Sequence, residues 1–316
     1  IVPSATFSTV ISPIIQSGLI PVFVDIQPDT YNICPDQIES AISNNTGLIM
    51  PVHSLGCPAD MKKIMKIANK HQIHVLEDCC EAHGASIGND KIGSFGILSS
   101  FSFFVAHNMT TGEGGMVLTN DEKLDEILRS KREFGRLTKY EKDKERFYYS
   151  DEYLKNYDER YVFKYMGYNI RMTELAASMG IEQLKKLDKL NEIRVKNAKE
   201  MIEELRDIDS LILPTIPEDY FHSFYAFTIL IKPNNKFSRK TMVNHLEQKG
   251  IETRAFMGGN LMKHPAYRNE LFKTIGSFKN TENIENNAFF IGCHPLINNN
   301  QKKYILNTIK KFIKSC

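Results

Sequence analysis

The sequence predicts an α/β protein with a largely parallel sheet, followed by a smaller α+β unit. From residue 1 to about residue 130, short apolar runs alternate with helical patterns, as strands joined by helical crossovers do. These runs are apolar without strict alternation, which is typical of strands that are buried on both faces. The pattern changes after Pro214 and Pro217. We therefore expect a large domain over residues 1–205 and a small C-terminal domain over residues 206–316.

The individual elements follow from local patterns in chain order. A charged, tyrosine-rich stretch over residues 131–171 predicts an exposed insertion whose tyrosines pack on the body or on a second subunit. Helical periodicity then covers residues 175–184 and 187–205, and Thr173 stands where an N-cap is expected. The predicted strands cover residues 1–7, 21–26, 48–53, 74–78, 98–105, 115–119, 225–231 and 252–256.

Composition limits the class of protein. The 316 residues suffice for a sizeable core, and 40 basic residues against 38 acidic ones create no field for nucleic acid. No apolar run approaches the roughly 20 residues that cross a bilayer. Six cysteines without paired C-x-x-C spacing favour free thiols in a reduced, cytoplasmic protein. We therefore expect a soluble protein without nucleic-acid, membrane or metal partners.

The stretch over residues 99–121 carries the strongest local signal. A predicted strand ends here in a polar turn, and a second strand follows directly. Between them, Gly112, Gly114 and Gly115 permit a positive φ or a close backbone approach, so a ligand can lie against the main chain. His107 stands at the edge of this turn. A loop histidine is most often a structural residue, and the pattern alone does not give it another role.

The string S-F-S-F-F-V-A-H-N-M-T-T-G-E-G-G-M-V-L-T-N-D resembles the cofactor-binding segment of the DegT/DnrJ/EryC1/StrS sugar aminotransferases. This resemblance implies a pyridoxal-phosphate (PLP) enzyme of fold type I. In most of that family, the position of His107 holds the lysine that forms a Schiff base with the cofactor. The resemblance covers essentially the whole chain and is densest over residues 74–121, 167–185 and 251–267.

A second string, E-D-C-C-E-A-H-G-A, resembles the family motif E-D-x-A-(Q/H)-A-H-G-A. The resemblance implies that Asp78 pairs with the protonated pyridine nitrogen and that Glu81 lies near the ring oxygen. An acid at the carboxyl end of a parallel strand is well placed for a ligand. From the residues alone, Asp78 is equally well a helix N-cap and His83 a packed histidine behind the site. Thr6 and Phe7 belong to the pocket wall by the same resemblance.

A third string, G-Y-N-I-R-M-T-E, matches the family's G-Y-N-x-R-M-T-E. The resemblance implies that Asn169 reaches the cofactor phosphate of the neighbouring subunit, so that a homodimer completes each site. Ser102 is expected to hold the phosphate as well. In the family, a considerable segment precedes the position of Ile1 and helps to bind the phosphate, so we expect part of that site to lie outside this sequence.

The string T-R-A-F-M-G-G-N-L-M-K-H-P resembles a narrower group within the family, the sugar 3-dehydratases. It makes Arg254 and Asn260 candidates for binding the nucleotide sugar, since arginine suits bidentate contact with phosphate. For Arg254, a salt bridge at a domain interface is an equally good interpretation.

Histidine in place of lysine changes the expected chemistry. Imidazole cannot bind the cofactor covalently, but its pKa near 6.5 lets it move protons at neutral pH. This combination suits pyridoxamine phosphate (PMP), whose own amine condenses with a ketone. We therefore expect His107 to act as a base in the loss of the 3-hydroxyl from a nucleotide-linked 4-keto-6-deoxyhexose. Glutamate then regenerates PMP, as in the family branch that acts on a GDP-linked sugar in colitose biosynthesis.

Three alternatives compete with this hypothesis. Another branch of the family holds an iron–sulfur cluster on four cysteines, but no cysteine lies between Arg132 and Tyr168, so no cluster is expected. A second alternative is an aminotransferase in which Lys91 or Lys164 supplies the Schiff base. A third is a pseudoenzyme that binds the cofactor or a nucleotide sugar and acts as a sensor.

Overall fold

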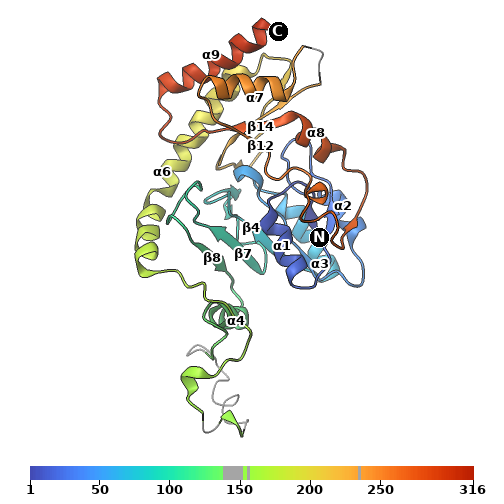
Figure 1. The fold of residues 1–316 in the computed structure, drawn as a ribbon, viewed down its shortest axis with the longest axis vertical. Coiled ribbons are helices and arrows are strands. Elements are labelled where there is room, and N and C mark those ends of the chain that lie inside the picture. Colours follow the sequence, from blue (N-terminus) through green and yellow to red (C-terminus); the bar gives the residue numbers. More distant parts are fainter. Residues whose placement is uncertain (138–151, 155–156, 234–235) are drawn as a thin grey trace.

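The computed structural model describes residues 1–137, 152–154, 157–233 and 236–316 (Figure 1). Its main sheet has the strand order β3 (Leu48–Ile49), β4 (His74–Asp78), β7 (Leu98–Ser102) and β8 (Gly115–Leu118). The pairs β3–β4 and β4–β7 are parallel, whereas β8 runs antiparallel to β7. The expected mostly parallel sheet is therefore present.

A second parallel sheet continues the first. In it, β2 (Val22–Val24) lies between β1 (Val2–Pro3) and β13 (Lys273–Thr274). Ile1, the residue before β1, donates to the carbonyl of Leu48 in β3 and accepts the N–H of Met50, the residue after β3, so the two sheets are connected there. A strand from the C-terminal third of the chain thus closes the outer edge of the N-terminal sheet.

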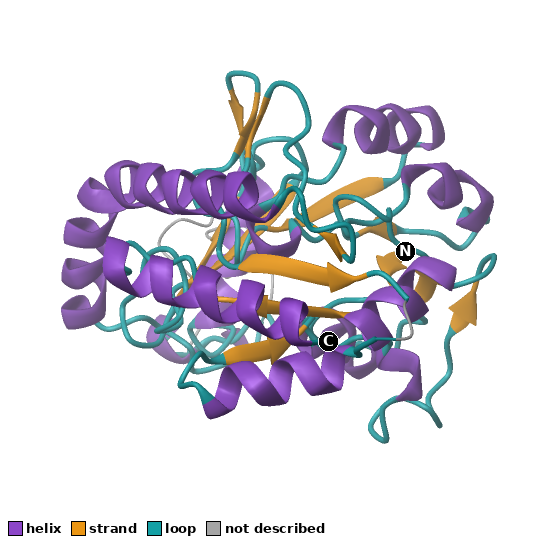
Figure 2. Cartoon of the chain, turned by 90° about the horizontal axis from the view of Figure 1, so that it is seen from above, coloured by secondary structure: helices purple, strands orange, loops and turns teal. Residues whose placement is uncertain are grey.

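Helices flank the strands, as the view from above shows (Figure 2). The helices α2 (Pro35–Ala41) and α3 (Met61–His71) share one apolar core with the sheet, and α1 (Ser8–Gln16) packs beside β1 and β2 in a second core. The Asp121 side chain caps α4 (Glu122–Arg132) by accepting the N–H of Leu124. Among these helices, α4 lies farthest from the C-terminal unit (Figure 1).

The two helices that periodicity predicts over residues 175–205 form one continuous helix, α6 (Glu174–Leu205). Thr173 is its N-cap, because its Oγ1 accepts the N–H of Ala176, and this prediction is confirmed. Buried side chains begin at Leu187. The helix runs from beside β8 to the C-terminal unit (Figure 1).

The C-terminal unit is α+β, as predicted. Its antiparallel sheet has the order β12 (Thr253–Ala255), β14 (Ala288–Ile291), β11 (Phe227–Ile231) and β9 (Leu211–Ile212). The second half of α6 shares the core of this sheet, so packing of the small unit begins before the predicted boundary at residues 205 and 206. That boundary stays a prediction. The remaining helices are α7 (Arg239–Gln248), α8 (Lys279–Asn287) and α9 (Asn299–Ser315).

The strand predicted over residues 98–105 is shorter in the structure, and most of it is only half-buried. It ends at Ser102, whose hydroxyl accepts the N–H of Phe104 and so diverts the backbone into a turn. Phe104 and Val105 are consequently exposed. Much of the predicted insertion over residues 131–171 falls outside the described residues, so its packing stays a prediction.

Two groups of short elements complete the described fold. The strands β5 (Ser86–Ile87), β6 (Asp90–Lys91) and β10 (Tyr220–Phe221) form a small antiparallel sheet. Short 3-10 turns lie at η1 (Ser54–Gly56), η3 (Glu159–Tyr161) and η4 (Leu261–Lys263). In the part of the chain that the structure describes, every helix is too short or too polar to cross a bilayer.

Candidate active site

Two adjacent parallel strands, β4 and β7, end at the same edge of the main sheet and bring the predicted residues together. Asp78 is the last residue of β4 and lies opposite Ser100 in the ladder, two residues before the end of β7. Its Oδ1 accepts the N–H of Cys80 in a turn. No helix follows β4 here, so the alternative role of Asp78 as a helix N-cap does not apply.

The loop after β7 holds His107 in one orientation. Its Nδ1 lies 3.1 Å from the carbonyl oxygen of Ser102. A carbonyl can only accept, so Nδ1 carries the proton and Nε2 keeps a free lone pair. Burial lowers the pKa of His107, while the Ser102 carbonyl and the nearby Asp78 charge oppose this shift. The imidazole is therefore neutral at neutral pH and can act as a base.

A pair of asparagines, which the sequence analysis did not single out, fixes this loop. Asn108 is buried next to His107 and donates through Nδ2 to Asn191 Oδ1 at 2.8 Å and to the Ser223 carbonyl at 3.2 Å. Asn191, on α6, donates in turn to the carbonyl of His83 at 2.7 Å. These bonds connect the loop to α6 and to the turn after β4. The only signal in the sequence is the asparagine that follows His107 in the predicted polar turn.

Glu81 lies in the turn after β4 and is only partly accessible. Its Oε2 accepts the N–H of Leu55 at 2.8 Å. Loss of hydration raises the pKa of its carboxyl to about 8, the charge of Asp78 adds to the shift, and the Leu55 N–H opposes it. Glu81 is therefore largely protonated at neutral pH and can donate as well as accept a hydrogen bond.

His83 lies directly behind His107. Its side chain is 2 % exposed, and neither ring nitrogen has a hydrogen-bond partner in the described part of the chain. Its ring packs 6.1 Å from that of His107 and within 6 Å of the rings of Phe101 and Phe103. Burial, helped by the neighbouring His107, lowers the pKa of His83 to about 4, so this histidine stays neutral.

A cavity of about 950 Å³ lies next to this group of residues. Glu81 lines it directly, whereas His107 adjoins it only through its neighbours Ala106 and Tyr225, and Asp78 and Ser102 are not among its lining residues. Glu81, Ala106 and Tyr225 line it on the side of the main sheet, and Arg254 lines it from β12. Arg254 forms an exposed ion pair with its neighbour Glu252, so its guanidinium also has a local partner. Of the two predicted pocket-wall residues, Phe7 lines the cavity.

Two other predicted residues lie elsewhere. Asn260 is buried and its Oδ1 caps η4 by accepting the N–H of Met262, and it forms a bridge with Ala5. Asn169 is exposed and pairs with Glu133 at the end of α4, away from the ends of β4 and β7 (Figure 1). Within one subunit, therefore, Asn169 does not join His107, and its role stays a prediction.

The lysines that could replace a Schiff-base lysine do not face the cavity. Lys91 is exposed and donates to the carbonyl of Gly84 at 3.0 Å. Lys164 stacks on Tyr165, in the segment beside α4, with 5.5 Å between its Nζ and the ring centroid. Neither residue lines the cavity beside His107.

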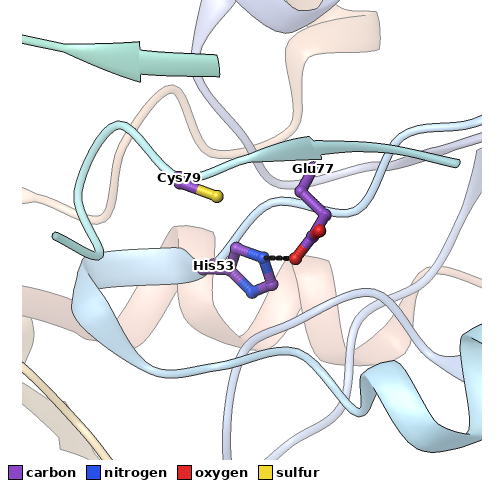
Figure 3. A group of neighbouring side chains, drawn as sticks. All are labelled: His53, Glu77 and Cys79. Carbon is purple, nitrogen blue, oxygen red and sulfur yellow. Dashed lines mark hydrogen bonds and ion pairs between the residues drawn. The ribbon is translucent and has the colours of Figure 1, made fainter. Parts of the chain in front are cut away.

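Behind the site, His53, Glu77 and Cys79 form a buried cluster whose ligand atoms lie within 4.8 Å of one another (Figure 3). His53 Nδ1 accepts the N–H of Ala59, so Nε2 carries the proton and donates to Glu77 at 3.2 Å. The carboxylate of Glu77 also accepts the N–H of Gly93, Phe95 and Gly96 at 2.8–2.9 Å. Since the imidazole and carboxylate are already satisfied, this cluster is structural and does not offer a metal site.

The arrangement of helices and strands is that of the PLP-dependent aminotransferase fold. The chain belongs to the DegT/DnrJ/EryC1/StrS aminotransferase family, whose model matches residues 1–310.

Several relatives are similar to this chain over nearly its whole length. It is 34% identical to the dTDP-4-dehydro-2,6-dideoxy-D-glucose 3-dehydratase of Saccharopolyspora spinosa, covering 97% of this chain and 68% of the relative. It is also 34% identical to the GDP-4-keto-6-deoxy-D-mannose 3-dehydratase of Yersinia pseudotuberculosis, covering 98% and 78%. A solved structure of GDP-4-keto-6-deoxymannose-3-dehydratase with a trapped PLP–glutamate geminal diamine superposes with a TM-score of 0.87 at 30% identity, covering 98% and 79%.

Proposed function

We propose that this protein is a PLP-dependent 3-dehydratase that removes the 3-hydroxyl from a nucleotide-linked 4-keto-6-deoxyhexose. The observation that carries the proposal is His107, a neutral base with a free Nε2, at the position where the family's aminotransferases have lysine. Imidazole provides acid–base catalysis without a covalent bond to the cofactor. The relatives that are named 3-dehydratases support this assignment.

The residues at the strand ends fit the cofactor. Asp78 accepts the N–H of Cys80 through one carboxylate oxygen, Oδ1, and would place the other against the pyridine nitrogen. Glu81, protonated at neutral pH, can share a hydrogen bond with the ring oxygen. Ser102 would hold the phosphate, together with Asn169 of a second subunit. When bound in its pyridoxamine form, the cofactor supplies an amine for the substrate ketone and a ring that withdraws electrons.

His107 performs the proton transfer next to the cofactor. Its Nδ1–H donates to the carbonyl of Ser102, so Nε2 is the atom that would take the proton from C4′ of the cofactor. Its lowered pKa keeps this nitrogen unprotonated before the reaction. Glutamate is proposed as the amino donor that restores the pyridoxamine form, because a related structure traps a PLP–glutamate adduct.

Arg254 is proposed to bind the nucleotide sugar, because it lines the cavity and its guanidinium is exposed. An arginine can exchange a surface carboxylate for a diphosphate at little cost, since an exposed ion pair contributes only about 0–1 kcal/mol. Asn260 would act from the adjoining loop. The choice between a GDP and a dTDP substrate is left to the assay, since relatives of both kinds are similar to this chain.

A homodimer is part of the proposal. All four residues of β8 are exposed, and they lie beside the N-terminal half of α6, which is also apolar on its outer face. Contiguous exposed apolar surface of this kind marks an interface. The large exposed apolar side chains of these elements and of the segment before α6 are Met116, Val117, Leu118, Met166, Ile170, Leu175, Met179, Ile181 and Leu184.

The decisive experiment supplies the protein with PLP, glutamate and GDP-4-keto-6-deoxymannose and measures the mass of the sugar nucleotide. A product that has lost one oxygen at C3 supports the dehydratase. A product in which the ketone oxygen has become an amine contradicts it and indicates an aminotransferase. An unchanged mass, repeated with the dTDP-linked sugar, indicates a protein that binds without turnover.

The dimer and the role of Asn169 can be tested together. The variants Asn169→Ala and His107→Asn are each expected to be inactive. If Asn169 serves the neighbouring site, a mixed dimer of the two variants contains one site with both natural residues and regains activity. Absence of activity in mixed dimers that light scattering shows to have formed would contradict the shared site.

A further inference from the structure

Tyr225 contacts His107 but takes no part in the proton transfer proposed for that histidine. The two rings meet edge to face, with 5.5 Å between their centroids. The tyrosine lines the same cavity as Glu81 and Ala106. Its backbone is fixed, because its N–H donates to the Leu55 carbonyl and its carbonyl accepts from Arg194.

The hydroxyl of Tyr225 is open to the cavity. No described residue hydrogen-bonds it, yet it is not among the buried polar atoms that lack a partner, so a ligand can reach it. Burial raises the pKa of this phenol, Glu81 adds to the shift, and the charges of Arg194 and Arg254 oppose it. The phenol is therefore protonated at neutral pH. The positive charges of Arg194 and Arg254 would stabilise the phenolate that forms when it gives up its proton.

The proposed reaction needs an acid as well as a base. A hydroxyl leaves carbon readily only when it is protonated as the bond breaks. His107 has no described partner at Nε2, and it can pass on the proton that it takes from carbon only after that transfer is complete, so a second donor is needed if the hydroxyl is to leave at the same moment. Glu81 can also donate a proton, but of these two acids it is Tyr225 whose side chain contacts the imidazole, which also packs against the rings of His83 and Phe104.

We propose that Tyr225 is a catalytic residue that protonates the departing 3-hydroxyl while His107 removes the proton from carbon. This role rests on the proposed function. The C3–O bond breaks with its electron pair going to oxygen, which takes the phenol proton and leaves as water. With the pyridoxamine form bound, the C–H bond that breaks would be the one at C4′ of the cofactor, and its proton would pass to His107. Its electron pair would form a carbon–nitrogen double bond, and the pair displaced from the substrate's carbon–nitrogen double bond would form a double bond between C3 and C4 of the sugar. One proton transfer from imidazolium to phenolate through cavity water restores both groups.

The test is Tyr225→Phe, which keeps the ring contact and removes only the hydroxyl. The matched control is Tyr220→Phe, on β10, which lies in a different sheet. Single-turnover dehydration is expected to fall about 10²- to 10⁴-fold in Tyr225→Phe, the usual contribution of a general acid. Formation of PMP from PLP and glutamate, in which no hydroxyl leaves, is expected to be unchanged. Equal thermal unfolding of the two variants shows that both are folded.

A substrate analogue isolates the protonation step. Fluoride leaves with less need for a proton than hydroxide does, so a substrate with fluorine in place of the 3-hydroxyl should release fluoride at similar rates from wild type and Tyr225→Phe. A variant that is slow with both substrates, or slow in the glutamate reaction, would show that Tyr225 only positions His107 and would overturn the acid role. Equal dehydration by variant and wild type would overturn it too, without touching the proposed function. A wild type that dehydrates no sugar overturns both.

Contact with the hydroxyl can be measured without turnover. GDP-mannose has no ketone and cannot react, so its affinity for the PMP-loaded protein reports binding alone. Removing either the tyrosine hydroxyl or the sugar 3-hydroxyl is expected to weaken binding about 2- to 12-fold, the value of one hydrogen bond, and removing both should cost no more. Independent, multiplying losses would show that the two hydroxyls do not meet and would contradict the proposal.

Discussion

Glu77 and Asp78 are neighbours on β4, yet their carboxylates have opposite surroundings. Alternation along a strand sends the two side chains to opposite faces of the sheet. Glu77 accepts four hydrogen bonds, from His53 and three backbone N–H groups, and is fully buried. Asp78 accepts one local N–H, from Cys80, and lies at the edge where the strands end. A satisfied carboxylate is structural, whereas one with capacity to spare can bind a ligand.

The same contrast separates the two histidines. In His53 both ring nitrogens have partners, Ala59 and Glu77. Among the residues that the structure describes, His107 has a partner only at Nδ1, the carbonyl of Ser102, which leaves Nε2 without one. One face of β4 therefore holds the fold together, and the other is the face that we propose for the reaction. Substitutions on each face of β4 test this difference between structural and reactive groups.

The largest effect is expected on the face of β4 that carries Asp78 and has His107 beside it, called the open face below. His107→Asn keeps a polar side chain but removes the base, and we expect the rate of proton removal to fall about 10²- to 10⁴-fold with little change in the free energy of unfolding. Single-turnover kinetics with glutamate and the PLP form measure this rate. His74→Asn, at the exposed start of β4, is the control. A His107→Asn protein that keeps the wild-type rate would move the base to another residue.

On the buried face, the face of Glu77, a substitution is expected to lower the free energy of unfolding. Glu77→Ala leaves His53 and three backbone N–H groups without their acceptor, which we expect to cost about 3–5 kcal/mol in the free energy of unfolding. Urea unfolding at neutral pH measures this cost. Glu113→Ala, an exposed change, is the control. A loss below about 1 kcal/mol would mean that the cluster is not structural.

The pH dependence of stability sharpens this prediction. Burial alone would raise the pKa of Glu77, but the hydrogen bond from His53 and the backbone donors Gly96 and Gly93 outweigh it, so its pKa lies below the usual range. A lowered carboxyl pKa contributes stability that is present above the unfolded value near 4.5 and is lost as the pH falls through the folded value. The difference between wild type and Glu77→Ala should therefore shrink in acid.

Sequence reasoning succeeded where a motif is local and stopped where the fold brings distant segments together. The end of β4 at Asp78 follows from an apolar run that stops at polar residues, and the turn that holds His107 follows from the polar and glycine-rich residues between two predicted strands. Tyr225 lies far along the chain, and only tertiary packing brings its ring to His107. Asn191 sits within a helical pattern that gives no sign of its bond to Asn108.

Two corrections have the same origin. The strand predicted through residue 105 ends at Ser102, because a side-chain hydroxyl captures the N–H of Phe104, a competition that hydrophobic patterns do not register. The two helices predicted within residues 175–205 are one helix, α6, since nothing at the junction breaks the backbone hydrogen bonds. Local hydrogen bonding decides such boundaries, whereas periodicity decides only that an element exists.

A smaller effect is expected for Asp78, the carboxylate that we propose to bind the cofactor. Asp78→Asn removes the charge that would face the cofactor ring but leaves the shape of the side chain. A charge-assisted hydrogen bond contributes about 1.5–3 kcal/mol, so PLP should bind roughly 10- to 150-fold more weakly while the protein stays as stable as the wild type. Titration with PLP, followed by its absorbance, measures this affinity. Unfolding of Asp78→Asn at neutral pH would place Asp78 with Glu77 among the structural carboxylates.

The smallest effect concerns Glu81, which combines features of both faces. Its pKa of about 8 means that the folded protein holds a proton that the unfolded chain releases above pH 4.5. The folded state therefore loses stability as the pH rises from about 4.5 to 8. Glu81→Gln cannot titrate, and we expect it to be more stable than the wild type by about 1–2 kcal/mol at pH 8, with no gain near pH 4.5, the shift being reduced by partial solvent access. Thermal unfolding across this pH range, with the cofactor absent, measures the difference. If the difference in stability between wild type and Glu81→Gln does not depend on pH, Glu81 is ionised in the folded protein. The open face would then carry two charged carboxylates, Asp78 and Glu81.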